Sequence, residues 1–214
     1  MEPKLVRVYP ARFAPRRFPA AGAVAAVGVV SLVSNSASAH LGTGLPGGFA
    51  SGFFHPFKGI DHLLAMVLVG VWGAFLGRPL IHLLPVVFPA MMVAGAIMGM
   101  FGVPLPPVEA GIALSVLVLG SCVALSIRAP DWAAALVVAV FAVFHGYAHG
   151  KELPSAADPG SYSAGFVLAT GLLHVSGIGI GLLNGRPRGV VLTRGFGGIT
   201  AALGVWFLYR AVGG

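Results

Sequence analysis

Long apolar runs separated by short polar turns dominate the chain after residue 40. About 20 apolar residues in a helix cross a bilayer whose hydrocarbon core is about 30 Å thick. The breaks between the runs hold residues that end helices, such as Gly77-Arg78-Pro79. We predict an all-α bundle of six transmembrane helices, over residues 57–77, 80–101, 108–128, 131–150, 161–184 and 190–212.

The first 39 residues have the pattern of a secretory signal peptide. Basic residues come first, an apolar stretch runs from Ala20 to Val33, and the segment closes on Ala37-Ser38-Ala39. Small residues at the first and third of these last positions fit a signal peptidase site. We predict cleavage after Ala39 and a mature protein, residues 40–214, that forms one membrane domain. An uncleaved signal anchor is the alternative.

Composition favours the same class of protein. The chain is 57% hydrophobic and only 9% charged, whereas a soluble domain has about 25% charged residues. We therefore expect an integral membrane protein with the lipid bilayer as a partner. The net charge of +7 does not indicate nucleic-acid binding, because five of the 13 Lys and Arg residues lie before residue 18. The single Cys122 excludes an intramolecular disulfide.

Basic residues in the short loops predict the orientation of the chain. If residue 40 lies outside, the basic side chains of the inside loops are Arg78, Arg128, Arg186, Arg188 and Arg194. The outside then holds Lys58, Lys151 and Arg210. This bias agrees with an exported N-terminus.

The first polar group is His55, Asp61 and His62, at the start of the first predicted span. Pro56 suits the first turn of a helix, where its missing N–H costs nothing. His55 and His62 are seven residues apart, so a continuous helix places them on one face. Asp61 is a functional candidate because an ionisable group inside a membrane is costly, and it can orient a neighbouring imidazole.

The second polar group is His145, His149 and Glu152, at the end of the fourth predicted span. Their spacings of four and three put them on one helical stripe if the helix runs through Gly150. Two imidazoles and a carboxylate can bind nickel, copper, zinc or iron, and the pattern alone does not choose among them.

The predicted topology brings the two groups to the same membrane face. The first span starts outside and the fourth span ends there, although the groups are about 90 residues apart in sequence. Two further positions are candidate metal or relay sites. His174 lies midway along the fifth span, and His40 would become the N-terminus after cleavage.

The chain resembles the HupE/UreJ family of bacterial membrane proteins in two motifs, His55-x5-Asp61-His62 and Phe144-His145-Gly146-Tyr147-Ala148-His149-Gly150-x-Glu152. The resemblance extends to the signal peptide, the six spans and His40. It implies an inner-membrane nickel permease, in some members a cobalt permease, associated with hydrogenase and urease accessory functions. It also implies that transport needs His55, Asp61, His62, His149 and Glu152. The second motif commonly has Ala where Gly146 stands, a small-for-small change.

We therefore expect a diffusion facilitator that takes up Ni²⁺ or Co²⁺ from the periplasm, where its mature N-terminus lies, and that holds no prosthetic group. The sequence contains no G-x-x-x-x-G-K-[ST] loop, so ATP coupling would need another subunit. The alternatives are a non-conducting metal-binding accessory protein, a membrane haem protein and an intramembrane hydrolase. H-E-x-x-H and G-x-S-x-G are both absent, so we do not expect an enzyme. The sequence does not distinguish nickel from cobalt as the transported ion. It also does not specify the oligomeric state or the metalloenzyme that receives the metal.

Overall fold

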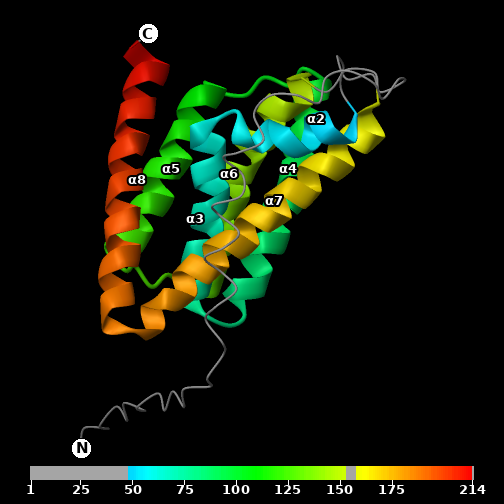
Figure 1. The fold of residues 1–214 in the computed structure, drawn as a ribbon. Coiled ribbons are helices and arrows are strands. Elements are labelled where there is room, and N and C mark those ends of the chain that lie inside the picture. The colour runs from blue at the N-terminus through cyan, green and yellow to red at the C-terminus, as the bar shows by residue number, and fades with distance from the viewer. Residues whose placement is uncertain (1–47, 153–157, 214) are drawn as a thin grey trace, which may run out of the picture. The chain divides into compact units, whose positions relative to one another are not determined.

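A computed structural model describes residues 48–152 and 158–213, and within these ranges the ordered elements are all helices. The predicted all-α class is therefore confirmed for this part of the chain (Figure 1). The predicted signal peptide, its cleavage site after Ala39 and His40 lie outside the described residues. The elements are α2 (Phe49–Phe54), the 3-10 helix η2 (His55–Phe57), α3 (Ile60–Leu76), α4 (Leu80–Met100), α5 (Val108–Ala124), α6 (Asp131–Glu152), α7 (Pro159–Gly181), the 3-10 helix η4 (Leu182–Gly185) and α8 (Pro187–Gly213).

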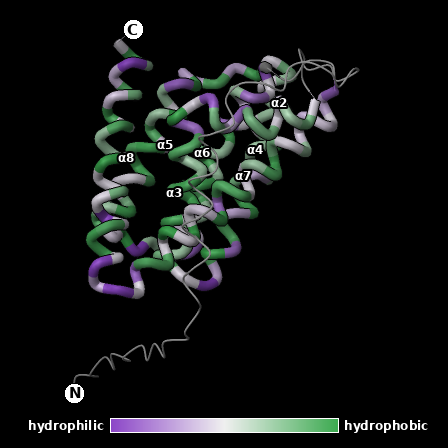
Figure 2. The backbone as a smooth tube through the Cα atoms, in the orientation of Figure 1, coloured by the Kyte–Doolittle hydropathy of each residue, from purple (hydrophilic) through white to green (hydrophobic). Residues whose placement is uncertain are grey.

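Four of the described helices are long and apolar enough to cross a membrane, namely α4, α6, α7 together with η4, and α8. The bent pair of α2–η2 and α3 is a fifth candidate, and α5 is apolar but only 17 residues long. Hydrophobic residues run along the helices, and hydrophilic ones gather toward the ends (Figure 2). The chain is thus a multi-pass membrane protein by length and composition of its helices, while the count of six spans stays a prediction.

The outward faces of the helices carry large apolar side chains. Val86, Val93 and Ile97 of α4 are all at least half exposed, and so are Val191 and Ile199 of α8. Contiguous apolar surface of this kind is unusual on a soluble monomer. It suits helices that face lipid.

The first predicted span is not one helix, and this corrects the sequence analysis. The chain breaks at Gly59, which is extended (φ −105°, ψ 115°), and α2–η2 meets α3 at 84°. Pro56 does stand in the first turn of a helix, but that helix is the short η2. The prediction that His55 and His62 share one face of a continuous helix is therefore wrong.

Glycine at position 59 allows this break to lie directly against the Asp61–His62 pair. A Cβ atom there would be 2.9 Å from Asp61 Oδ1 and 3.0 Å from His62 Nδ1. Both distances are too short for ordinary packing, so a side chain at position 59 would displace the Asp61–His62 pair.

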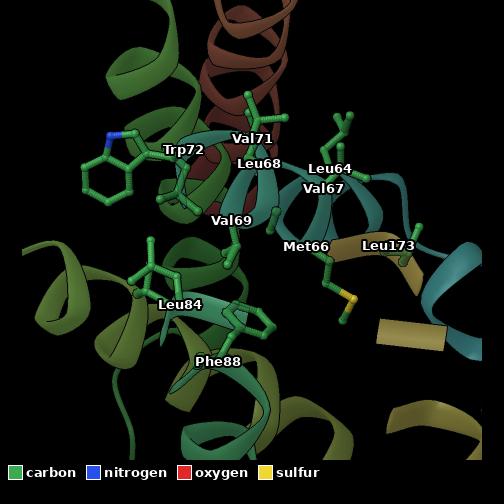
Figure 3. Close-up of a cluster of buried hydrophobic side chains, with 14 of the residues drawn as sticks. Leu64, Met66, Val67, Leu68, Val69, Val71, Trp72, Leu84, Phe88 and Leu173 are labelled. Carbon is green, nitrogen blue, oxygen red and sulfur yellow. The ribbon is translucent and has the colours of Figure 1, made fainter. Parts of the chain in front are cut away.

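Helix α3 forms the centre of the bundle, in contact with α4, α5, α7 and α8. Every residue from Leu64 to Gly73 is buried, as expected for a helix that is hydrophobic all round. Figure 3 shows Leu84 and Phe88 directed from α4 toward Val69 of α3. This packing places the first turn of α3 at the same end of the bundle as the last turns of α6.

Where α4 crosses α6 and α3 crosses α7, the helices approach so closely that only glycine fits. A Cβ atom on Gly146 of α6 would collide with the backbone carbonyl of Met92 in α4. A Cβ atom on Gly70 of α3 would collide with the backbone carbonyl of His174 in α7. Small residues let membrane helices approach in this way, because no hydrophobic force draws helices together in lipid. The crossings fix the positions of the α6 and α7 histidines along the axis of the bundle.

Candidate metal centre

Four imidazole rings meet where the start of α3 faces the end of α6. The ring centroid of His149 lies 4.8 Å from that of His55 and 4.9 Å from that of His62. The rings of His62 and His145 are 5.0 Å apart. We call these four residues the four-histidine cluster. The predicted convergence of the two motifs is confirmed, although the 84° bend, and not a shared helical face, brings His55 to it.

Asp61 fixes the orientation of His62. Its Oδ1 atom accepts a hydrogen bond from His62 Nδ1 at 2.9 Å and from the backbone N–H of His62 at 2.8 Å. Because Nδ1 carries the proton in this arrangement, the lone pair of the imidazole lies on Nε2. That Nε2 atom is buried and has no hydrogen-bond partner.

His145 repeats this arrangement with a backbone acceptor. The side chain is fully buried, and Nδ1 donates to the carbonyl oxygen of Phe141 one turn earlier, at 2.9 Å. Its Nε2 atom is then the acceptor, and it is buried without a partner. An oxygen that holds one ring nitrogen and frees the other is the usual support of a metal-binding histidine.

His149 stands at the centre of the cluster. Only 8% of the side chain is exposed, and neither ring nitrogen has a hydrogen-bond partner. Its ring contacts His55, His62 and Phe166 of α7. It contacts both histidines of the first motif.

The unpaired nitrogens define the chemistry of the site. An unsatisfied buried polar group costs about 1–3 kcal/mol, and native folds keep few of them. Here the Nε2 atoms of His62 and His145 and both nitrogens of His149 lie close together in this state. Neutral imidazole binds nickel, copper, zinc and iron, so a divalent cation would satisfy these atoms.

The rings meet in pairs and do not surround a point. Within residues 48–152 and 158–213, no group of three His, Cys, Asp or Glu side chains is arranged to hold a metal ion. A cation at the cluster would therefore need small movements of the side chains to complete its coordination.

The other predicted site residues lie outside the cluster or outside the described part of the chain. Helix α6 continues through Gly150 to Glu152, as the predicted stripe requires, but the side chain of Glu152 is not described. His40 precedes the described residues. His174 is buried in α7, and the ring centroid of Phe88 lies 5.3 Å from that of His174 and 5.4 Å from that of His145.

A stripe on α7 faces the cluster, and of its residues only His174 was predicted from the sequence. It consists of Tyr162, Phe166, Thr170 and His174, all at least 92% buried. Tyr162 and Phe166 contact the ring of His55, and Phe166 also contacts His149. The regular spacing of four, which puts residues on one helical face, is the signal that could have found it.

The fold and the cluster together define a class, a helical multi-pass membrane protein with buried imidazole nitrogens that lack hydrogen-bond partners at one end of its bundle. Residues 26–207 match the family described as HupE / UreJ protein. The chain is 44% identical to Protein HupE of Rhizobium leguminosarum bv. viciae over 172 residues, which are 80% of this chain and 90% of that protein. No solved structure matches the chain. The chain belongs to the HupE/UreJ family, and the resemblance noted in the sequence is confirmed.

Proposed function

We propose that the protein takes up Ni²⁺, or Co²⁺, across the bacterial inner membrane. The observation that carries this proposal is the convergence of four imidazoles, of which His62, His145 and His149 have buried ring nitrogens without hydrogen-bond partners. The family's association with hydrogenase and urease accessory functions supports nickel as the cargo. The protein would then supply the metal for maturation of such an enzyme and would itself be no enzyme.

The ligand set combines neutral nitrogen and charged oxygen. His55, His62 and His149 replace part of the hydration shell of the incoming ion, with His145 beside them. Asp61 balances part of the ion's charge while it holds His62 in the binding tautomer. Glu152, one helical turn beyond His149, adds the second carboxylate.

A facilitator is the simplest mechanism for this chain. Moving a divalent cation inward gains roughly 4–5 kcal/mol per 100 mV, from about 2.3 kcal/mol per elementary charge. Capture of the ion by its client protein in the cytoplasm keeps the free inner concentration low. The ion gradient and the membrane potential then drive uptake without ATP.

Uptake of ⁶³Ni²⁺ by cells that express the wild type, Asp61→Asn or His149→Ala at matched levels tests the proposal. Wild-type uptake that collapses in both variants supports a conducting site built from the two motifs. Excess unlabelled Co²⁺ in a parallel sample shows whether the two ions share the site. Uptake that is equal in all three strains would refute the proposed site.

A non-conducting accessory protein with the same ligands is the second candidate. It would bind Ni²⁺ through the four-histidine cluster and pass it to a partner without moving it across the membrane. Only the absence of flux through the purified protein would favour it.

A further inference from the structure

Two polar side chains deep in α7 are buried without hydrogen-bond partners. His174 and Thr170 are each only 1% exposed, and they lie one turn apart on the stripe that faces the four-histidine cluster. Neither nitrogen of His174 nor the hydroxyl of Thr170 has a partner. A packed structural histidine would donate its ring N–H to a neighbour, so a purely structural role leaves this arrangement unexplained.

Helix α4 presents a further oxygen to His174. The backbone carbonyl of Pro85 lies against the imidazole, although not in hydrogen-bonding geometry. In a regular helix this carbonyl would accept from the N–H of residue 89, but residue 89 is also proline and has no N–H. The pair Pro85 and Pro89 thus leaves a carbonyl oxygen beside His174 without its usual helical donor.

The ring of Phe88 contacts both this region and the four-histidine cluster. Phe88 is fully buried, and its ring contacts both His145 and His174. An apolar ring excludes water, while its face attracts a passing cation. Phe88 therefore has the properties of a partition between two cation sites.

A cleft of about 90 Å³ between α4, α6 and α7 extends from the four-histidine cluster to Thr170. His149 borders it at the four-histidine cluster, and Phe166 and Thr170 border it along α7. One ordered water needs about 10–15 Å³ of such volume, so the cleft has room for an ion that keeps part of its hydration shell.

We propose that His174, Thr170 and the carbonyl of Pro85 form a second site for a divalent cation, separated by Phe88 from the four-histidine cluster. The inference rests on the proposed function and adds a second step to it. A cation bound at the cluster moves along the cleft, exchanges some ligands for His174, and continues along α7. One imidazole and neutral oxygens bind it more weakly than several imidazoles, as a site that must release its ion requires.

The test uses the full-length protein in two assays, ⁶³Ni²⁺ flux into proteoliposomes and the number of Ni²⁺ ions bound at saturation in equilibrium dialysis. His174→Ala is the main variant. His82→Ala is its matched control, because His82 is an exposed histidine on the first turn of α4. Size-exclusion profiles establish that the variants fold.

We expect His174→Ala to keep binding at the four-histidine cluster, to bind fewer ions in total, and to lose about tenfold or more in flux. His82→Ala should match the wild type. A His174→Ala protein with wild-type flux and wild-type stoichiometry would overturn the second site.

Phe88→Ala tests the partition, with Leu84→Ala as its control. Both residues are fully buried on α4 one turn apart, so both variants leave a cavity in the same core. We expect the wild type and Leu84→Ala to exclude Mn²⁺ and only Phe88→Ala to admit it. Equal ion selectivity in the two variants would refute the partition.

The two assays also separate this inference from the proposed function. If the wild type transports no Ni²⁺ into proteoliposomes, the proposed uptake is refuted. The number of Ni²⁺ ions bound at saturation then tests the second site by itself. A bound ion that is lost in His174→Ala supports that site, and equal stoichiometry refutes it.

Discussion

Asp61 and the carbonyl of Phe141 perform the same task for two histidines. Each accepts a hydrogen bond from Nδ1 of an imidazole and leaves Nε2 for another ligand. Asp61 differs from the carbonyl in its negative charge. It is one of only six acidic residues in the whole chain. A carboxylate placed so close to unpaired imidazoles also favours the approach of a cation.

Substitutions of Asp61 separate its charge from its hydrogen bond. Asp61→Asn keeps an oxygen that can accept from His62, whereas Asp61→Ala removes the acceptor as well. We expect Ni²⁺ affinity to fall by about tenfold in the first variant and by up to about 100-fold in the second, the range for groups that support metal ligands. Isothermal titration calorimetry of the purified protein measures both values.

Asp131→Asn is the control for the charge. Asp131 is exposed in the first turn of α6, at the opposite end of the helix from His145 and His149. Its removal should leave Ni²⁺ affinity unchanged. If Asp61→Asn bound Ni²⁺ as tightly as Asp131→Asn, the charge of Asp61 would have no part in the site.

Helices α4 and α6 are held together by backbone contact at Gly146. The family motif commonly has Ala at this position, a small-for-small change, but here the backbone of Met92 occupies the space that a Cβ atom would need. A chain with Ala at position 146 must therefore place α4 farther from α6. The cleft beside His149 is lined by both Gly146 and Met92, so its width depends on this crossing.

Gly146→Ala should destabilise the protein. Overpacking of a close contact costs about 1–3 kcal/mol, which exceeds the gain of about 1 kcal/mol from replacing a helical glycine by alanine. Gly179→Ala in α7 is the control, because no neighbouring atom lies within 4 Å of its added Cβ. The control should be neutral or more stable.

Thermal unfolding in detergent, followed by the loss of monodisperse protein in size-exclusion chromatography, measures the difference. A midpoint of Gly146→Ala equal to or above that of Gly179→Ala would show that α4 and α6 are not in backbone contact at this position.

For the chain as a whole, hydropathy predicted the helical membrane class and most helix boundaries. It predicted α4 over 80–101 and α6 over 131–150, close to the observed Leu80–Met100 and Asp131–Glu152. It could not predict the bend at Gly59, because the residues on both sides are apolar enough for one span. Hydropathy measures transfer to lipid and contains no information on backbone direction.

The candidate site was predictable to a similar extent. Motif spacing identified the histidines of the cluster, because polar residues in an apolar chain are few. The way in which α4, α6 and α7 cross brings His149 against Phe166, and it brings Phe88 against both His145 and His174. Those crossings are set by glycine contacts, and 32 glycines spread along the chain do not indicate which of them touch another helix.

The N-terminus of the mature protein remains a prediction with a direct test. Mass spectrometry of the protein extracted from membranes should give a chain that begins at His40, since Ala37-Ser38-Ala39 fits a signal peptidase site. Ala39→Arg should block processing, and Ser38→Thr, which keeps both small positions, should not. A wild-type chain that retains residues 1–39 would establish an uncleaved anchor instead.

The central claim, that the four-histidine cluster belongs to a conducting path for nickel, is tested most directly by flux through the purified protein. Proteoliposomes that enclose a Ni²⁺-sensitive dye receive external Ni²⁺ under an imposed potential, with His149→Ala protein in a parallel set. We predict dye quenching that becomes faster as the interior is made more negative, and almost none with His149→Ala. Wild-type protein that binds Ni²⁺ but shows no potential-dependent flux would contradict the account and leave a non-conducting metal-binding accessory protein.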